Sequence, residues 1–450
     1  MWEDVIASYL ASLRRVGPSE TDAAEQWAAN ASMFAATASW RLKLVSGVPW
    51  LRLIRVHSHW AERANVLRLV LLSLAASPPH ADFELVYVHN DLDPTPAARP
   101  HALPRPPLFT NARRHPGGAG LPLPDFTWLG WRSTPPWCQL LPLLSAEARR
   151  HPWHTRDPRA FFSGGLDNGA VRRAVRRLYL SSGEARAALA LRDAEAGHSF
   201  RWPQYDRANR SGGLPPKQPP LPPSAVCRHQ FALSLPGFGY ASRLRALLAC
   251  GALVLHVPSP HEEFFAPALR DGEHLVVLRG RDPVGRRLLP TLRRLAAEPR
   301  RAAAIAAAGQ RFAQRWLAHG SVVDYTAGLL RAYAARFDGE VRVTPDDVRL
   351  RAAAAGQEDE QLRRVMGMCH CVTSRRRRNA SAEERQRRRE SEACMAQGKG
   401  QRCRPWPPRG GGRCFAPKCC QGWDCGVHPL ECPTTNATSS TSYNDGERTT

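Results

Sequence analysis

The stretch PGFGYASRLR, residues 236–245, decides the fold that we expect for this chain. An apolar run at 231–235 precedes it and predicts a short buried strand. The chain then continues into 244–249, which predicts the first turns of a helix, and into 252–257, which predicts the next strand. A strand, a glycine-rich turn, a helix and a second strand in this order are typical of a parallel α/β sheet.

Two glycines and one arginine lie where the predicted strand turns into the predicted helix. Backbone N–H groups and the positive end of a helix bind phosphate at such turns, and glycine lets the backbone approach the anion. Gly237 and Gly239 fit that role, and Arg243 adds a planar fork of hydrogen-bond donors. The stretch therefore predicts an anion site, and a glycine turn of purely structural purpose is the alternative that the stretch alone leaves open.

Predicted strands and helices alternate along most of the chain. Further strands are expected at 50–56, 83–89, 159–165 and 273–278, and helices at 58–77, 169–180, 300–318 and 322–337. Residues 1–45 are alanine-rich and predict helices with a break at Pro18, and Ser259 is expected to cap a helix over 262–265. The alternation predicts an α/β protein with two Rossmann-like halves that face each other across a cleft.

The composition divides the chain into four parts. They are an N-terminal helical segment at 1–47, a Rossmann-like domain at 48–157, a second Rossmann-like domain with closing helices at 158–340, and a basic linker with a cysteine-rich tail at 341–450. The tail has no Cys-x2-Cys pair with a partner, which speaks against zinc and favours a disulfide-bonded module that binds a glycan or an acceptor. Its arginine clusters at 375–378 and 387–389 favour a solvated linker.

The composition is that of a globular protein with a large excess of positive charge. Hydrophobic residues make up 43% of the 450 residues, and the formal net charge is +23. Such a charge fits an anionic ligand, a nucleic acid or an acidic surface, and an arginine-rich coding bias explains it equally well. No nucleic-acid-binding module is recognisable, so we do not expect nucleic acid as a partner.

Nine of the twelve cysteines lie between 369 and 432, and four Asn-x-Ser/Thr sequons begin at Asn30, Asn209, Asn379 and Asn436. Clustered cysteines and sequons favour an oxidising lumen, that of the endoplasmic reticulum or the Golgi. The sequence shows no signal-peptide pattern at its start and no apolar run long enough to span a bilayer. We therefore expect an incomplete N-terminus or an unusual targeting route.

Four short motifs follow one another in order. They are FFSGG at 161–165, CRHQF at 227–231, GFGYASR at 237–243 and EFF at 263–265, the last followed by His274. In this order and spacing the sequence resembles glycosyltransferase family 90, the group of protein O-glucosyltransferases, protein O-xylosyltransferases and capsule-associated xylosyltransferases. The resemblance implies a GT-B fold and the transfer of glucose or xylose from a UDP-sugar to a hydroxyl of a protein or glycan, with inversion and without a metal. The first Rossmann-like domain would face the acceptor, and the second would hold the UDP-sugar.

The resemblance also assigns residues to the site. Asp93 matches the catalytic aspartate, Trp128 lies in the aromatic segment beside the acceptor, and Cys227 and Cys250 match a disulfide pair. The implied donor-binding residues are Gly165, Arg172, Phe238, Gly239, Tyr240, Ala241, Ser242, Arg243 and Glu263. Arg173 fits the place of the second arginine nearly as well as its neighbour does.

The chemistry of sugar transfer suits these groups. A carboxylate at a loop edge can take the proton of the acceptor hydroxyl, and we expect Asp93 to do so, with Asp91 as the rival. Arg243, a second arginine and helix N-terminal amides can stabilise the departing UDP in place of a metal. Structural alternatives stay open: an Asx turn before Pro94, a pairing role for Glu263 on its helix, and a place in the core for the clustered tryptophans.

Two departures from the family pattern favour a second function. Ser163 stands where an arginine is usual, and Ala241 stands where the protein glucosyltransferases have serine. The alternative to an active enzyme is therefore a catalytically inactive family member that binds glycan or protein.

Overall fold

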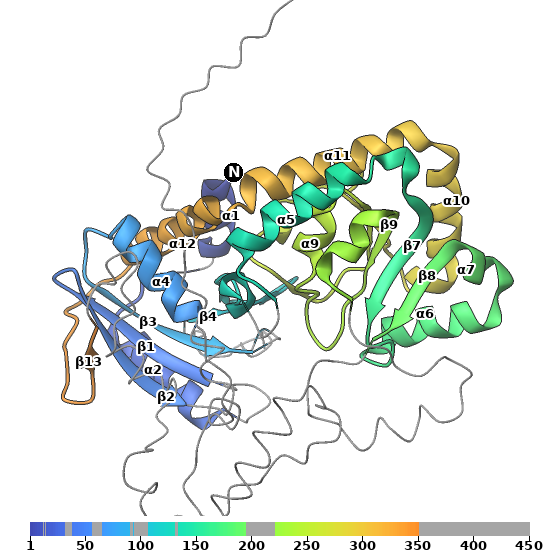
Figure 1. Ribbon diagram of the computed structural model, residues 1–450. Coiled ribbons are helices and arrows are strands. Elements are labelled where there is room, and N and C mark those ends of the chain that lie inside the picture. Colours follow the sequence, from blue (N-terminus) through green and yellow to red (C-terminus); the bar gives the residue numbers. More distant parts are fainter. Residues whose placement is uncertain are drawn as a thin grey trace, which may run out of the picture.

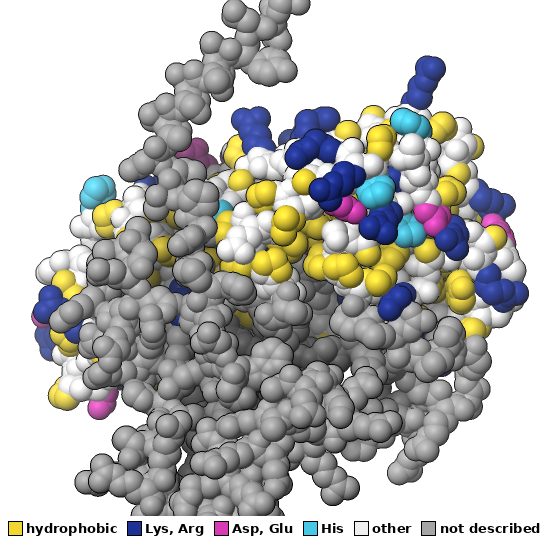
Figure 2. All heavy atoms as spheres, in the orientation of Figure 1, with side chains coloured by type: hydrophobic (Ala, Val, Ile, Leu, Met, Phe, Trp, Pro, Cys, Tyr) yellow, Lys and Arg dark blue, Asp and Glu magenta, His cyan; other side chains and the backbone are white. Residues whose placement is uncertain are grey.

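Two β-sheets, each covered by helices, lie side by side in the computed structural model (Figure 1). The structure describes residues 1–11, 13, 15–31, 38–55, 65–90, 93, 107–130, 134–194 and 221–350. Long helices run along one side of the molecule and connect its N-terminal half to its C-terminal half (Figure 1). Figure 2 shows basic side chains spread over the outer surface of the C-terminal half, with fewer acidic side chains among them.

The N-terminal half is built on a six-stranded mixed sheet. Its strand order is β13 (Val348–Arg349), β2 (Val48–Arg55), β1 (Ala38–Val45), β3 (Phe83–His89), β4 (Leu108–Thr110) and β6 (Leu121–Pro122). The first four strands in this order are antiparallel to their neighbours, and β3, β4 and β6 are parallel. Every residue of β3 is buried because helices cover both faces of the sheet, which explains its nearly continuous apolar sequence.

β1 corrects the expectation that residues 1–45 are helical, because this strand pairs along both of its edges. Its sequence alternates apolar residues with Arg41 and Lys43, which is the period of a strand. Both cations are buried, in ion pairs with Glu84 at 2.6 Å and with Asp347 at 2.8 Å. Their partners come from distant segments, Glu84 from β3 and Asp347 from just before β13, so the sequence of the segment alone did not reveal how two charges could be buried in it.

Helices pack on both faces of this sheet. They are α1 (Trp2–Leu10), α2 (Pro18–Asn30), α4 (Asn65–Ala76) and α12 (His319–Ala334). On β3, Val86 and Val88 pack with residues of α2, whereas Leu85 and Tyr87 belong to the core shared with the other three helices. The last of these helices reaches this core from the C-terminal half and thereby ties the two halves together (Figure 1).

The C-terminal half holds a five-stranded sheet in which all strands are parallel. The strand order is β12 (Val276–Val277), β10 (Leu253–His256), β9 (His229–Ser234), β7 (Asp157–Gly164) and β8 (Leu189–Asp193). β7 and β9 are neighbours in the sheet. From β7 the chain continues to β8 on one side, and from β9 it continues to β10 and β12 on the other side, so the direction of the strand order reverses between them. Ligands bind outside the carboxyl ends of parallel strands at such a switch point, and residues 236–245 follow β9 there.

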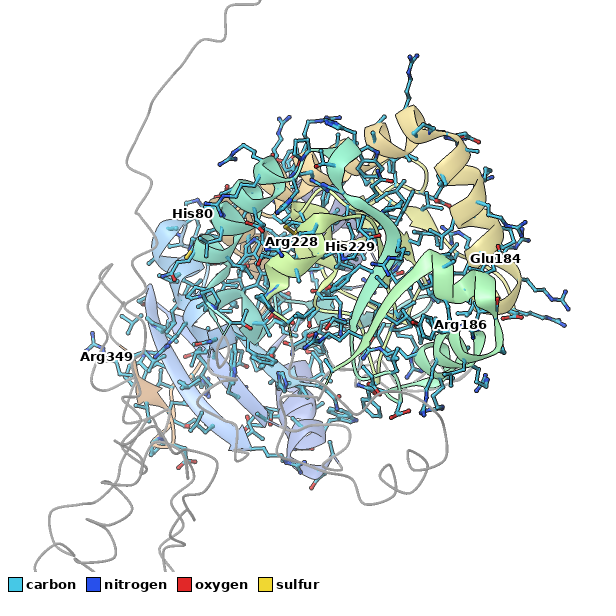
Figure 3. The ribbon with its side chains drawn as sticks, turned by 45° about the vertical axis from the view of Figure 1, so that its right-hand side comes forward. His80, Glu184, Arg186, Arg228, His229 and Arg349 are labelled. Carbon is cyan, nitrogen blue, oxygen red and sulfur yellow. A yellow bond between two sulfur atoms is a disulfide. The ribbon has the colours of Figure 1, made fainter. Side chains whose placement is uncertain are left out.

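The predicted strand–turn–helix–strand unit around residues 236–245 is confirmed as β9, α9 (Leu244–Ala249) and β10. The other helices of this half are α5 (Trp137–Arg150), α6 (Ala170–Ser181), α7 (Gly183–Ala188), α10 (Leu289–Ala297) and α11 (Pro299–Trp316). Arg228 and His229, labelled in Figure 3, lie where β9 begins and so mark the amino end of the parallel sheet. Short helical turns lie at Phe126–Leu129, Trp153–Thr155, Pro223–Arg228, Ala266–Ala268 and Pro283–Leu288.

A two-stranded sheet joins the two halves and corrects the helix expected at 262–265. β11 (His261–Glu262) pairs antiparallel with β5 (Arg113–Arg114) from the N-terminal half. Ser259 does accept a backbone N–H, that of His261 at 3.0 Å, but the chain then extends instead of coiling. The pairing partner lies far back in the sequence, so the local capping signal was a poor guide.

Residues 341–350, which the sequence placed in the linker, belong to the N-terminal sheet through β13. Asp347 holds this segment against the sheet through ion pairs with Lys43 at 2.8 Å and with Arg52 at 3.1 Å. The cysteine-rich tail and its arginine clusters lie outside the described residues. None of the helices described is both long and apolar enough to cross a membrane.

Candidate active site

Arg243 lies at the start of α9, directly above the carboxyl end of β7. Its guanidinium donates to the carbonyl of Ser163, and a Cβ atom on Gly164 would lie 2.7 Å from its Nη2. Gly164 also has a φ of 157°, which glycine adopts without strain. The arginine therefore needs glycine at this position, one residue before the Gly165 expected from the sequence.

Arg172 comes to the same place from α6. It is buried, and it donates to the carbonyl of Leu235 at 3.2 Å and to that of Gly165 at 3.4 Å. Its Nε has no hydrogen-bond partner among the residues that the structure describes. The neighbouring Arg173 is exposed and donates to the carbonyl of Asp167 at 3.0 Å, so the structure brings Arg172, and not Arg173, to the switch point.

The two arginines share one aromatic ring. The guanidinium carbons of Arg172 and Arg243 lie 5.5 and 4.8 Å from the centroid of the Phe162 ring. Among the described residues, no carboxylate forms an ion pair with either of them. Desolvation and then the charge of Arg243 lower the pKa of Arg172 to about 9, and desolvation lowers the pKa of Arg243 to about 10. Two desolvated cations without a carboxylate form a site that an anion would stabilise.

The glycine loop, residues 236–243, ends with Arg243, and its other side chains differ in their contacts and exposure. Tyr240 donates its hydroxyl to Asp125 Oδ2 of the N-terminal half at 2.8 Å. Ala241 and Gly239 are buried, whereas Ser242 is exposed and Phe238 has 66% of its surface open to solvent. The loop therefore has one anchored face and one face available to a ligand.

A pocket with about 760 Å³ of empty space, counting its open mouth, lies beside the glycine loop. It lies at the carboxyl ends of β9, β10 and β12, and its lining includes Tyr240, Ala241, His256, His261, Glu263 and Arg279. The sequence did not single out the two histidines or Arg279. His256 and Arg279 come at or just after the ends of parallel strands, which is the signal that could have found them.

Glu263 is a buried carboxyl group at the wall of this pocket. Within the described part of the chain, its Oε1 has no hydrogen-bond partner. Burial, and then the charge of Asp125, raise its pKa well above the ordinary value, and Arg245 lowers it less. Glu263 therefore holds its proton more tightly than an exposed glutamate does, and in its protonated form the carboxyl group donates as well as accepts a hydrogen bond.

Trp128 lies in the core between the halves and not on an open surface, with 2% of its surface exposed. Its ring packs 5.6 Å from that of Trp137 and 5.5 Å from that of Phe264, and the guanidinium of Arg245 lies 4.2 Å from its centroid. Of the two interpretations of the tryptophan cluster, the core position describes Trp128 and Trp137. Trp131 lies outside the described residues.

Asp93 is buried at the junction of the two halves. Its Oδ2 accepts the backbone N–H of Arg114, and its own N–H donates to Nδ1 of His261, both at 2.8 Å. A Cβ atom on Gly118 or Gly120 would press on its carboxylate, so the glycines of the 117–120 turn make room for it. That glycine run was a sequence signal for the position. Asp91 and Pro94 lie outside the described residues.

Cys227 and Cys250 lie at bonding distance, with their sulfur atoms 2.02 Å apart. One precedes β9 and the other ends α9, so the bond joins the two ends of the unit that carries the glycine loop. Among the residues that the structure describes, no cluster of three or more His, Cys, Asp or Glu side chains is arranged to hold a metal ion.

Comparison of the sequence with models of known protein families agrees with the resemblance that the four motifs indicated. A search of curated proteins finds no match. The sequence model of the family described as glycosyl transferase family 90 matches residues 34–397, which is more than half of the chain. The chain therefore belongs to glycosyl transferase family 90.

Proposed function

We propose that this protein is an inverting, metal-independent glycosyltransferase with a GT-B arrangement of its two halves. It moves glucose or xylose from a UDP-sugar to a hydroxyl group of a protein or glycan. The observation that carries this proposal is the pair Arg172 and Arg243, which come together at the switch point of a parallel sheet without a carboxylate partner among the described residues.

The arginine pair suits the diphosphate of the nucleotide. Guanidinium groups bind phosphate oxygens through paired hydrogen bonds, and desolvation strengthens the attraction. The same groups stabilise the negative charge that develops on UDP as the glycosidic bond breaks, which is the task a metal ion performs in other enzymes. Arg172 and Arg243 therefore take the electrophilic role in this proposal.

The pocket beside the glycine loop suits the nucleoside. It adjoins Tyr240 and Ala241 of the loop and opens at the carboxyl ends of three strands, where nucleotides bind in such sheets. Glu263, a buried carboxyl group whose Oε1 has no hydrogen-bond partner among the described residues, can form a hydrogen bond with a hydroxyl of the ligand. Gly239 and Gly165 leave room for a close approach of the backbone.

Asp93 is the base in this proposal. Inverting transfer needs one carboxylate, which removes the proton of the acceptor hydroxyl while its oxygen attacks the anomeric carbon opposite the leaving UDP. The Arg114 N–H holds Oδ2, which orients the carboxylate at the junction between the halves. The new bond forms to the acceptor oxygen, the bond to the UDP oxygen breaks, and the proton resides on Asp93.

A lumenal location, in the endoplasmic reticulum or the Golgi, is part of the proposal. The Cys227–Cys250 pair and the sequons support it, since disulfides persist in oxidising compartments. Asn30, the first sequon residue, is exposed at the end of α2, where a glycan would have space.

A catalytically inactive member that binds glycan or protein is the second candidate. Ser163 and Ala241 favour it, because they depart from the family pattern. Ser163 nevertheless contributes its backbone carbonyl to Arg243, a contact that does not depend on its side chain.

A panel of UDP-sugars, assayed for binding by calorimetry and for turnover by UDP release, tests the proposal. We expect one of UDP-glucose or UDP-xylose to bind, and Asp93→Asn to keep binding while losing turnover by at least about 100-fold. If no UDP-sugar binds, the enzyme proposal fails. If the sugar binds but Asp93→Asn turns over normally, the base is another residue. Binding without turnover by the wild type would favour the inactive member.

A further inference from the structure

His261 connects the residue proposed as the base to the glycine loop. Nδ1 of the His261 imidazole accepts the backbone N–H of Asp93 at 2.8 Å. The backbone N–H of His261 donates to Ser259 Oγ at 3.0 Å. The Ser259 hydroxyl donates to the carbonyl of Gly239 at 3.3 Å. These hydrogen bonds link the loop that would hold the UDP-sugar, through Ser259 and His261, to the backbone amide of the residue proposed as the base.

The β5–β11 pairing fixes the position of the imidazole. His261 is the register partner of Arg114, and the N–H of His115 donates to the carbonyl of Pro260 at 2.8 Å. The N–H of Arg114 donates to Asp93 Oδ2. The same two-residue ladder thus holds the backbone of Asp93 through the imidazole and its carboxylate through a peptide N–H.

We propose that His261 is a positioning residue for sugar transfer, whose Nδ1 holds the peptide of Asp93 so that the carboxylate faces the acceptor hydroxyl. This inference rests on the proposed function, because it takes Asp93 as the base. A base acts only within hydrogen-bond reach of the proton that it removes, and a displacement of about 1 Å costs on the order of 100-fold in rate. Nδ1 of His261 does not take the proton of the acceptor hydroxyl, since it already accepts the Asp93 N–H.

The contact requires a neutral imidazole with its proton on Nε2. Burial and then the charge of Arg114 lower the pKa of His261, and the charge of Asp93 raises it. The other ionisable groups that line the same pocket are Tyr240, His256, Glu262, Glu263, Asp271 and Arg279. Below the pKa of His261 the protonated Nδ1 becomes a donor that faces another donor, so the contact is lost in acid and present at neutral pH.

Three variants separate positioning from general effects on the fold. His261→Ala removes the acceptor, and His261→Asn keeps one, because the side-chain oxygen of Asn can take the place of Nδ1. His274→Ala is the matched control, since His274 Nδ1 also accepts a backbone N–H, that of Arg270 at 3.0 Å, in a turn remote in sequence from Asp93.

The first readout is steady-state transfer with UDP binding measured in parallel. We expect His261→Ala to lower kcat by roughly 10- to 100-fold with unchanged UDP affinity, His261→Asn to recover most of the rate, and His274→Ala to match the wild type. In the wild type, kcat should fall in acid as His261 becomes protonated. His261→Asn should lack this fall in the plot of kcat against pH, because Asn does not titrate. If His261 only supported the fold, kcat would fall equally in both His261 variants, and the dependence of kcat on pH would keep its wild-type shape.

The second readout, hydrogen–deuterium exchange at the Asp93 amide, does not depend on activity. We expect faster exchange in His261→Ala and near wild-type exchange in His261→Asn. Unchanged exchange in His261→Ala, or an active wild type with an unchanged kcat in that variant, overturns the positioning role and leaves the proposed function standing. A wild type that binds no UDP-sugar overturns the proposed function and, with it, this role in transfer.

Discussion

The guanidinium groups of Arg172 and Arg243 lie over a single ring, that of Phe162, at 5.5 and 4.8 Å from its centroid. One arginine comes from α6, after β7, and the other from the start of α9, after β9, so each side of the switch point supplies one cation. Two cations this close repel each other, and no described carboxylate pairs with them. Bringing these two cations together therefore costs stability, which a bound anion would restore.

Replacing either cation should separate ligand binding from stability. We expect Arg172→Met or Arg243→Met to weaken UDP binding by roughly 10- to 100-fold, since a hydrogen bond to a charged group contributes about 1.5–3 kcal/mol. Without nucleotide, the free energy of unfolding should stay equal or rise, because a desolvated, uncompensated charge is removed. Calorimetric titration with UDP and denaturant unfolding measure the two effects.

Arg173→Met is the control for the arginine variants, because Arg173 is exposed on the same helix. It should bind UDP like the wild type. Equal losses in the Arg172 and Arg173 variants would show that general basic charge, and not the arginine pair, attracts the nucleotide.

Glu263 should make the protein less stable as the pH rises. Its pKa in the folded protein is raised well above the ordinary 4.5, so between these two values the folded state holds a proton that the unfolded state has lost. The free energy of unfolding therefore falls with pH through this window, by at most about 1.4 kcal/mol per pH unit for one proton. Denaturant unfolding at a series of pH values should show a flatter profile for Glu263→Gln. An identical slope in the variant would mean that the carboxyl group is ionised in the folded protein.

The Tyr240–Asp125 hydrogen bond should hold the glycine loop against the N-terminal half. We expect Tyr240→Phe to lower kcat/KM for the UDP-sugar by roughly 3- to 10-fold, the equivalent of about 1 kcal/mol for one hydrogen bond. Tyr179→Phe on α6 is the matched control, because no hydrogen bond of its hydroxyl is among those described. A Tyr240→Phe variant with wild-type kinetics would show that the loop is held without this contact.

Removal of the Cys227–Cys250 bond should destabilise the C-terminal half. The bond closes a loop with a sequence separation of 23, which corresponds to about 3 kcal/mol in the chain-entropy treatment. Denaturant unfolding of the double variant Cys227→Ala, Cys250→Ala measures this loss, and Cys138 stays unchanged so that the result reports on one bond. A loss well below 1 kcal/mol would mean that packing alone holds the two ends of the glycine-loop unit.

The sequence was informative where signals are local. The apolar runs and amphipathic periods of the C-terminal half predicted β7, β9, α9, β10 and α11 because each element shows its period within its own residues. The glycine-rich turn before α9 predicted where an anion would bind, and the four motifs identified the family. β1 was missed because its charges are neutralised by partners that lie far away in the sequence.

Tertiary structure alone decided which residues meet. Asp93 and His261 are separated by 168 positions, and only the β5–β11 pairing brings the imidazole to the Asp93 amide. The choice of Arg172 over Arg173 likewise depends on which face of α6 packs toward the sheet. The sequence by itself determined the fold class, the family and the glycine loop, since these depend on local pattern. The arginine pair, the raised pKa of Glu263 and the setting of Asp93 were decided by the fold, because burial and distance between segments are properties of the packed chain.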